Sequence, residues 1–432
     1  MKKIAILVCL IAGLFSIEAR SATWQAITRV ALDGRAGPQT VLVRDGLIYA
    51  VGRDLDIPET SSRIDGRGLH AIPGLAEMHG HTPVPQGNPD SDFVRDMMFL
   101  YVANGVTTVR GMLGGPGQLE LRQRVNDGEV LGPTLFLAGP SFSGQSISSP
   151  GQAAKRVLAQ KRAGWDLLKV HPGLTVAEYD TMAIAARQQG IRFGGHVPAG
   201  VGLRRAIAMG QHTFDHIDGY LQQLNVPQQA MDPDALAELV TLSRESGVWI
   251  VPTLVLWDYV IGLGDADKLI EQPDNDYWPQ NQVRGWYLSM KNRQGDQRAL
   301  RAYSHARSSV LKALHEGDVG ILMGTDSPQI FSVPGFSIHR EMAAMQSAGM
   351  SPRAIIESGT ENVARYLQGH RAIGRIAPGY QADLILTEDD PYENLATLRR
   401  PVGVMVQGRY LDRLALDEGL RAIRQKHTTP GS

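Results

Sequence analysis

The chain has 432 residues, of which 43% are hydrophobic and 20% charged, and its formal net charge at pH 7 is -1. This composition is typical of a globular protein and argues against a wholly disordered chain and against a coiled coil. The length allows two or three domains, or one large barrel with an accessory domain. The balanced charge argues against a nucleic-acid partner.

The first 21 residues have the pattern of a secretory signal peptide. Lys2 and Lys3 precede an apolar run over residues 4–15, and residues 19–21 (Ala-Arg-Ser) provide a cleavage site. An uncleaved anchor is the alternative, although the run is short for a membrane span. We therefore expect an exported protein, periplasmic or secreted, that is not attached to a membrane after cleavage.

Cleavage would also remove the only cysteine, Cys9, which leaves the mature chain without a disulfide, a thiol nucleophile or a thiolate ligand. The segment contains three positive residues and one negative residue, so its loss changes the net charge from -1 to -3.

Both ends of the mature chain are rich in strand patterns. Alternating or apolar runs at 39–43 and 47–51 flank a turn at 44–46, and strand-like runs recur at 382–386 and 402–407. We expect residues 22–72 and 373–412 to form one small β-sandwich domain built from both ends. A C-terminal helix and tail would follow over residues 413–432.

Residues 73–372 alternate between strand and helix patterns, which predicts an α/β fold. The strands are expected at 71–78, 106–111, 134–138, 167–171, 192–196, 212–216, 249–253 and 319–324, and helices at 92–103, 151–163, 176–189, 203–209, 233–246 and 304–316. Eight strands with intervening helices favour a distorted TIM (β/α)8 barrel. Strand number alone leaves an open doubly wound sheet as the alternative, but neither a G-x-G-x-x-G loop nor a Walker A motif is present.

Residues 258–303 interrupt this alternation after the seventh strand. The segment is polar, and Trp278 and Trp286 lie within it, shortly after Trp257. A long excursion at this point is more typical of function than of an idle loop. We interpret it as a lid with aromatic contacts or as an oligomer surface.

The strongest local motif is His79-Gly80-His81 at the end of the first strand. Side chains at positions i and i+2 of a strand face the same side, so the two imidazoles can converge on one ion. The carboxyl ends of barrel strands are also where active sites form in this fold. An isolated His-x-His motif is a weak signal, because many occur by chance.

Four other strand ends carry groups of the same kind. Lys169 ends the fourth strand, His196 the fifth, His216 the sixth and Asp326 the eighth. Each has a structural alternative: a strand-end histidine is often only a satisfied polar residue, and Asp326 could cap a helix. Their joint placement at one mouth favours a metal site.

Lys169 lies among apolar strand residues, where a protonated amine is costly to bury. Desolvation favours the neutral amine, which reacts with carbon dioxide to give a carbamate. The product, N6-carboxylysine, is a carboxylate that can bridge two cations. An ammonium group paired with a carboxylate is the alternative.

This set of strand-end residues resembles the amidohydrolase superfamily, and more narrowly its imidazolonepropionase-like branch, which includes metal-dependent prolidases and carboxypeptidase-like enzymes. The resemblance spans residues 25–410 and includes the motifs at 72–75 (IPGL), 105–110 (GVTTVR), 324–327 (GTDS), 374–376 (GRI) and 379–384 (GYQADL). Family members commonly have an aspartate after the arginine of the second strand, where this chain has Gly111. The presence of Lys169 argues against imidazolonepropionase activity itself.

The resemblance implies two divalent metal ions. His79, His81 and Asp326 would hold one ion, His196 and His216 the other, and carboxylated Lys169 would bridge them. Imidazole and carboxylate ligands suit Zn2+, with manganese and cobalt left open. A metal-bridging hydroxide would attack a carbonyl carbon, and Asp326 would move the proton to the leaving amine.

Three weaker candidates complete the predicted site. His171 could donate to the substrate carbonyl or carboxylate, or support a ligand. Tyr220 could bind a substrate carboxylate or oxyanion at the rim, and Arg110 could clamp a carboxylate. For each, a solvated or ion-paired loop residue is the alternative.

The sequence thus predicts an exported metal-dependent hydrolase that cleaves an amide or peptide-like C–N bond of a small substrate, such as a dipeptide or an N-acyl amino acid. A cyclic amide, lactone or other ester substrate is the first alternative, since the same site would serve. A non-catalytic binding protein on this scaffold is the second, and the retention of all six ligands argues against it. A homo-oligomer is left open.

Overall fold

The computed structural model describes residues 22–226, 228–293 and 295–428. The expected signal segment and Cys9 lie outside the described residues. Among the described residues, no helix combines the length and the apolar character that crossing a bilayer requires.

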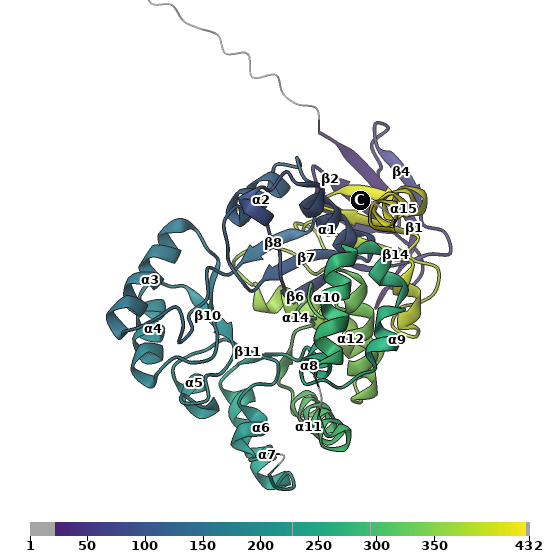
Figure 1. Cartoon of the computed structure of the whole chain (residues 1–432). Coiled ribbons are helices and arrows are strands. Elements are labelled where there is room, and N and C mark those ends of the chain that lie inside the picture. Colours follow the sequence, from purple (N-terminus) through teal and green to yellow (C-terminus); the bar gives the residue numbers. More distant parts are fainter. Residues whose placement is uncertain (1–21, 227, 294, 429–432) are drawn as a thin grey trace, which may run out of the picture.

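One sheet is built from strands at both ends of the chain (Figure 1). Its strands pair in the order β16-β15-β14-β5-β1-β2-β3, with β4 added beside β1. Buried apolar side chains from both ends, such as Ile27, Val41 and Leu384, form one cluster within it. The bounds are β1 (Trp24–Leu32), β2 (Gln39–Arg44), β3 (Leu47–Gly52), β4 (Ser62–Asp65), β5 (His70–Pro73), β14 (Leu384–Thr387), β15 (Gly403–Val406) and β16 (Arg409–Asp412).

The predicted turn at 44–46 joins β2 to β3. Asp45 and Gly46 both have positive φ, at 50° and 79°. Two consecutive positive φ values match the twist of a two-residue hairpin, and aspartate followed by glycine is a favoured pair for it.

The expected strand at 71–78 is two strands that belong to different sheets. β5 pairs with β14, whereas β6 (Leu75–Gly80) pairs with β7. Gly74 separates them, and a Cβ there would lie only 2.1 Å from Thr107 Oγ1. The sequence prediction merged the two strands because the apolar run continues through this glycine.

The middle of the chain forms two sheets in which every pair of strands is parallel. One has the order β6-β7-β8 and the other β13-β12-β11-β10-β9. This confirms the α/β fold class. The remaining bounds are β7 (Val106–Gly111), β8 (Thr134–Leu137), β9 (Leu167–Val170), β10 (Arg192–Gly195), β11 (Thr213–Asp215), β12 (Trp249–Val251) and β13 (Gly320–Ile321).

Helices follow most of these strands and pack their apolar faces over them (Figure 1). Local signals set their starts: Ser91 caps α1, and Thr175 with Glu178 forms a capping box on α4. These helices are α1 (Asp92–Ala103), α2 (Gln118–Asn126), α3 (Pro150–Ala163), α4 (Val176–Gln188), α5 (Leu203–Ala208), α6 (Tyr220–Gln223) and α7 (Pro233–Glu245).

The segment 258–303 is mostly helical and packs against its neighbours through aromatic side chains. Trp278 is buried, with its ring 5.1 Å from that of Phe93 in α1, and Trp286 lies 5.9 Å from Phe331. Asp274 accepts a hydrogen bond of 2.6 Å from Arg340. The helices in and around the segment are α8 (Leu254–Val260), α9 (Ala266–Ile270), η2 (Pro273–Tyr277), α10 (Gln280–Lys291) and α11 (Gln297–Glu316).

The last helix, α15 (Arg413–Thr428), lies beside α1 (Figure 1). Leu416 packs there with Val102 of α1 and Val404 of β15 in one apolar cluster. Along the chain, three helices follow β13 and precede β14: α12 (Phe336–Ser347), α13 (Pro352–Ser358) and α14 (Glu361–Tyr366).

Candidate metal centre

The carboxyl ends of β6, β11 and β13 bring three predicted residues together. His79, His216 and Asp326 each offer a ligand atom, and these atoms lie within 4.8 Å of one another. Asp326 Oδ1 is 3.6 Å from His79 Nε2, and its Oδ2 is 3.8 Å from His216 Nε2. His81 joins them, with Nε2 2.6 Å from Asp326 Oδ1.

Lys169 reaches the same point from β9. Its Nζ lies 3.1 Å from His79 Nε2, and the side chain is fully buried. Among the described residues, the nearest carboxylate oxygen is Asp215 Oδ2, 3.9 Å away. Gly195 of β10 allows this approach, because a Cβ there would lie 2.8 Å from the Lys169 Cδ.

The imidazole rings form a continuous row across the site. The ring centroids are 5.9 Å apart for His81 and His79, 4.6 Å for His79 and His216, and 4.5 Å for His216 and His196. His171 extends the row by stacking on His196 at 5.0 Å. The structure therefore places all six predicted ligands, and His171, in one group of contacting side chains; we call the five rings the imidazole row.

Two of these histidines contact a carboxylate through Nδ1. The sequence analysis did not single out either carboxylate. Asp215 Oδ2 is 2.7 Å from His79 Nδ1, and Asp218 Oδ2 is 2.6 Å from His196 Nδ1. A carboxylate at the far ring nitrogen fixes the tautomer that leaves Nε2 free to bind a metal. The available signal was strand alternation, which places Asp215 on the same side as Thr213, two residues before it; both contact the buried Arg110.

Arg110 is not a carboxylate clamp at the rim, contrary to the sequence prediction. Its side chain is buried at 1% exposure and donates from Nη2 to Asp215 at 3.3 Å and from Nη1 to Thr213 Oγ1 at 3.1 Å. Strand alternation points it into the interior, where it neutralises a buried carboxylate.

Tyr220 is also not at the rim. It is fully buried in α6, and its hydroxyl lies 2.6 Å from Ser243 Oγ of α7. Burial raises the pKa of Tyr220. The turn after β11 carries the chain back into the helical layer within four residues, which removes Tyr220 from the site.

Glu77 ties β6 to the segment that carries Asp326. Its carboxylate accepts hydrogen bonds from the backbone N of His79 and of Thr325, at 3.1 and 2.8 Å, and from the Thr325 hydroxyl at 2.6 Å. Burial raises the pKa of Glu77 to about 8. Its role is to fix two ligand-bearing segments against each other.

The backbone at the site is held in conformations that side chains rarely adopt. His216, Ile217, Thr253 and Asp326 have φ values of 66°, 58°, 44° and 61°. Such residues cost about 1–3 kcal/mol each and cluster at functional sites. Arg307 of α11 supports this region.

Arg307 is 2% exposed and donates to three backbone oxygens at the ends of β11 and β12. These are the carbonyls of His216, Pro252 and Leu254, at 3.2, 3.0 and 3.4 Å. Trp257 lies under the guanidinium, 5.7 Å from ring centroid to Cζ, and 5.5 Å from the His216 ring.

The charges of the site favour neutral imidazoles beside an ionised aspartate. Burial lowers the pKa of His79 to about 4, and the charge of Lys169 acts in the same direction. Burial alone would raise the pKa of Asp326, but His79 and His81 lower it to about 2. Burial also lowers the pKa of Lys169, although Asp215 and Asp326 oppose this. Neutral imidazole and ionised carboxylate are the forms that bind metals.

The donor set fits divalent cations. Imidazole and carboxylate groups are typical ligands of zinc and of related ions. His216 Nε2 is buried and has no hydrogen-bond partner among the residues that the structure describes. An unpaired buried imidazole nitrogen beside an aspartate is an atom that a metal ion can bind.

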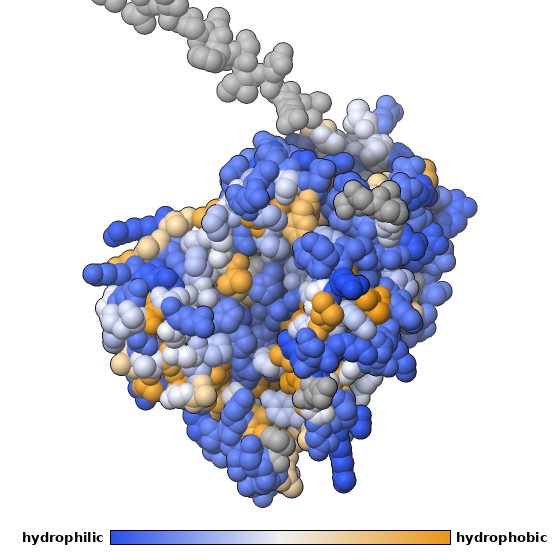
Figure 2. Space-filling view, viewed as in Figure 1, coloured by the Kyte–Doolittle hydropathy of each residue, from blue (hydrophilic) through white to orange (hydrophobic). Residues whose placement is uncertain are grey.

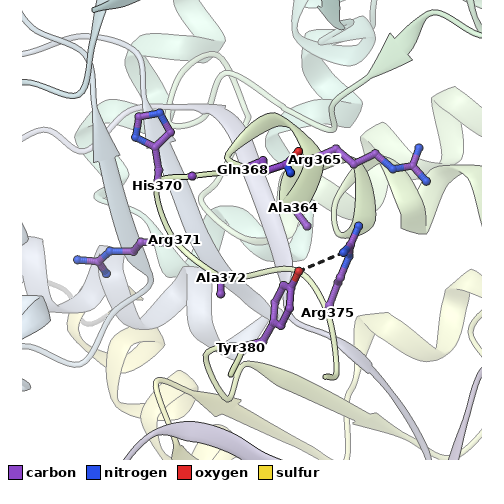
Figure 3. A pocket seen from close by; sticks show the side chains of 9 residues that line it. Ala364, Arg365, Gln368, His370, Arg371, Ala372, Arg375 and Tyr380 are labelled. Atoms are coloured by element: carbon purple, nitrogen blue, oxygen red, sulfur yellow. Dashed lines mark hydrogen bonds between the residues drawn. The ribbon is translucent and has the colours of Figure 1, made fainter. Parts of the chain in front are cut away.

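A cavity beside α14 lacks these features. Figure 3 shows a cavity of about 370 Å³ beside α14, where the guanidinium groups of Arg365 and Arg371 point away from each other. Arg375 in this cavity is bonded to Tyr380, 3.1 Å from its hydroxyl, and to Glu361. None of the predicted site residues lines it.

Residues 71–411 match the model of the amidohydrolase family. The chain belongs to the amidohydrolase family. Among curated proteins, this amidohydrolase is similar to ochratoxinase from Aspergillus niger, with 23% identity over 431 residues that cover 84% of this chain and 80% of that protein. The family is one of hydrolases that use divalent metals, so the amidohydrolase is a metal-dependent hydrolase acting on amide or peptide-like C–N bonds.

Solved structures share the fold of the amidohydrolase. A bottromycin amidohydrolase is 22% identical with a TM-score of 0.75, covering 94% of this chain and 91% of that chain. A Xaa-Pro dipeptidase with methionine bound in its active site is 21% identical with a TM-score of 0.68, covering 90% of this chain and 100% of that chain. The match to the family model over residues 71–411 confirms the resemblance to the superfamily.

Proposed function

We propose that the enzyme cleaves the amide bond of a small substrate, a dipeptide or an N-acyl amino acid, at a site for two divalent cations. The observation that carries this proposal is the convergence of His79, His216 and Asp326, joined by His81 and Lys169. The names of the similar proteins, a Xaa-Pro dipeptidase and a bottromycin amidohydrolase, agree with an amide or peptide substrate.

We propose that the two parallel sheets close into one distorted (β/α)8 barrel. Backbone hydrogen bonds support closure at both seams: Gly139 N donates to Leu167 O at 3.1 Å, and Met78 N donates to Met323 O at 2.8 Å. In this proposal residues 73–372 form the barrel, residues 22–72 and 373–412 the β-sandwich domain, and 413–432 a terminal helix and tail.

The site residues divide between two ions. One ion would be held by His79, His81 and Asp326. The other would be held by His196 and His216, and the unpaired Nε2 atom of His216 is the ligand atom available to it. Zn2+ is the proposed metal, since imidazole nitrogen dominates the donor set. When bound, two such ions lower the pKa of a water molecule and polarise a carbonyl group.

Lys169 is proposed to bridge the ions as N6-carboxylysine. The amine nitrogen forms a bond to the carbon of carbon dioxide, and one proton is released. The buried position of Lys169 favours this, because its amine lies 3.1 Å from an imidazole nitrogen of His79 and 3.9 Å from the nearer carboxylate oxygen of Asp215. The carbamate would add a carboxylate ligand among the imidazole nitrogens that surround Lys169.

Asp326 is the proposed proton carrier. Its two oxygens face His81 and His216, so it lies between the two proposed ion positions, where it can take a proton from the attacking water and pass it to the leaving nitrogen. His171, stacked on His196 at the end of the row, is placed to donate to a substrate oxygen.

The test is the metal content of the purified protein, measured by plasma mass spectrometry together with hydrolysis of an amide panel. We expect about two zinc ions per chain, and we expect Lys169→Ala to lose metal and activity together. Lys161→Ala, on the exposed end of α3, is the matched control and should keep both. One ion per chain with an active Lys169→Ala variant would refute the bridged site.

We also propose that the enzyme is exported, to a periplasm or outside the cell. This rests on the pattern of residues 1–21, with Lys2, Lys3 and the apolar run after them.

A further inference from the structure

Two cavities lie at opposite ends of the imidazole row. The His81 cavity, of about 390 Å³, is lined by His81, Pro83, Val84, Leu113, Pro116 and Pro328, among others. The His171 cavity, of about 560 Å³, is lined by Ser141, Ser143, Gly144, Gln145, His171, Pro172 and Gly173. Both are in the size range of small-molecule sites.

The His81 cavity offers apolar surface and few free polar groups. Its side chains are mainly proline, valine and leucine, and Leu113 is 43% exposed at its edge. Its two amide side chains are already engaged. Gln118 donates to the carbonyls of Thr82 and Leu113, at 2.8 and 3.1 Å, and Gln329 donates to the Asp326 carbonyl at 3.0 Å. A substrate group that fills this cavity gains by burying hydrocarbon.

The His171 cavity has the opposite chemistry. Hydroxyl, amide and imidazole groups line it, and no acidic side chain does. Gln145 is exposed, and its amide has no hydrogen-bond partner among the described residues. His171 Nδ1 is buried and likewise has no hydrogen-bond partner within the described part of the chain. Arg156 is near, donating to the Ser141 carbonyl at 2.8 Å. These groups suit a hydrogen-bond acceptor such as a carboxylate.

Figure 2 shows a mostly hydrophilic face on which apolar side chains gather in small separate groups near its centre. No single broad apolar surface is visible on that face.

We infer that the substrate lies along the imidazole row, with an apolar acyl side chain in the His81 cavity and the carboxylate of the leaving amino acid in the His171 cavity. This inference rests on the proposed function and specifies its substrate class. In dipeptides and N-acyl amino acids the free carboxylate belongs to the amine half of the scissile bond. The apolar cavity therefore selects the acyl half.

The experiment uses the metal-loaded enzyme and three compounds: acetylglycine, hexanoylglycine and hexanoylglycinamide. We expect the wild type to prefer hexanoylglycine over both others in kcat/KM. Leu113→Ser should reduce the ratio of hexanoylglycine to acetylglycine about tenfold, since one or two methylene groups in an apolar pocket change discrimination by that order. The matched control is Ile184→Ser in α4, because Ile184 is 48% exposed and lines neither cavity.

Gln145→Glu tests the other cavity with a change of nearly equal shape. We expect it to reduce the ratio of hexanoylglycine to hexanoylglycinamide more than tenfold, mainly through KM, because the new carboxylate repels that of the substrate. An unchanged chain-length ratio in Leu113→Ser, or an equal change in Ile184→Ser, overturns the inference. So does an unchanged carboxylate ratio in Gln145→Glu.

The two levels of proposal fail differently. Hydrolysis of amides with no preference for chain length or for a carboxylate overturns this inference and leaves the proposed function intact. A metal-loaded wild type that hydrolyses no amide overturns the proposed function, and the inference with it.

Discussion

Asp215→Asn is the sharpest test of how the site is held. The carboxylate is fully buried, 2.7 Å from His79 Nδ1 and 3.3 Å from Arg110 Nη2. Burial alone would raise the pKa of Asp215, but Arg110 and His79 hold it below its ordinary value. The substitution keeps the shape of the side chain and removes its charge. Arg110, at 1% exposure, then remains charged without an ionic partner.

The expected cost follows from that unpaired charge. Removing one partner of a buried ion pair costs about 3–5 kcal/mol. We expect about 3 kcal/mol, the low end of that range, because the amide oxygen of asparagine can still accept one hydrogen bond from Arg110. The double variant Arg110→Met/Asp215→Asn leaves no charge behind, so it should be more stable than the sum of the single variants by about 2 kcal/mol.

The assay is urea unfolding of the chelator-treated protein, followed by circular dichroism, with stability compared at equal slope. Chelation keeps metal binding out of the difference. Asp33→Asn is the control, since Asp33 and Arg353 form an ion pair at the surface with side chains 39% and 50% exposed. That pair should contribute less than about 1 kcal/mol. A loss below about 1 kcal/mol for Asp215→Asn, or strict additivity in the double variant, would refute the reasoning.

Three further predictions concern residues around the site. Arg307→Met removes the donor to three buried carbonyls, including that of His216. We expect the free energy of unfolding to fall by about 3 kcal/mol, and the metal affinity, measured by chelator competition, to be at least tenfold weaker. An unchanged metal affinity would contradict this prediction. Tyr220→Phe removes only the hydroxyl that meets Ser243, so stability should fall by about 1 kcal/mol while kcat/KM stays within twofold; a tenfold fall would restore Tyr220 to the site. Glu341 of α12 is buried and accepts hydrogen bonds from the backbone N of Leu254 and Val255 at the start of α8. Burial raises the pKa of Glu341 to about 7 in the folded state, from 4.5, so the folded state binds the extra proton and stability falls as pH rises through about 4.5 to 7. Glu341→Gln should remove about 3 kcal/mol of that pH dependence, measured as the difference from wild type in urea unfolding at pH 4.5 and 7.5.

The sequence was sufficient for elements whose signals are local. The strand at 106–111 and the helix at 92–103 appear with the predicted bounds, because their apolar spacing and the cap at Ser91 act within one turn or one strand. The division at Gly74 was missed, since it depends on the close approach of Thr107 from a neighbouring strand. The helices within 258–303 were missed for a similar reason: Trp278 and Trp286 order that segment through contacts with distant residues.

The same distinction applies to the site. Residues at strand ends could be found because the ends of parallel strands meet, and the six proposed ligands do lie together. The predicted roles of Arg110 and Tyr220 were wrong because strand alternation and the turn after β11 decide which way a side chain points. Asp215 and Asp218 went unnoticed as partners of the histidines, since a contact such as that between Asp215 and His79 joins residues far apart in sequence.

The sheet built from both ends of the chain has a consequence for the order of folding. β5 gains its antiparallel neighbour only when β14 arrives, with Leu384 opposite Pro73 and Thr387 opposite His70. A single residue, Gly74, then connects β5 to β6, which carries His79. The residues of β14 that anchor the start of β6 through β5 are thus among the last to be synthesised. A nascent or truncated chain that ends before residue 384 exposes the edge of β5, which invites pairing with another chain.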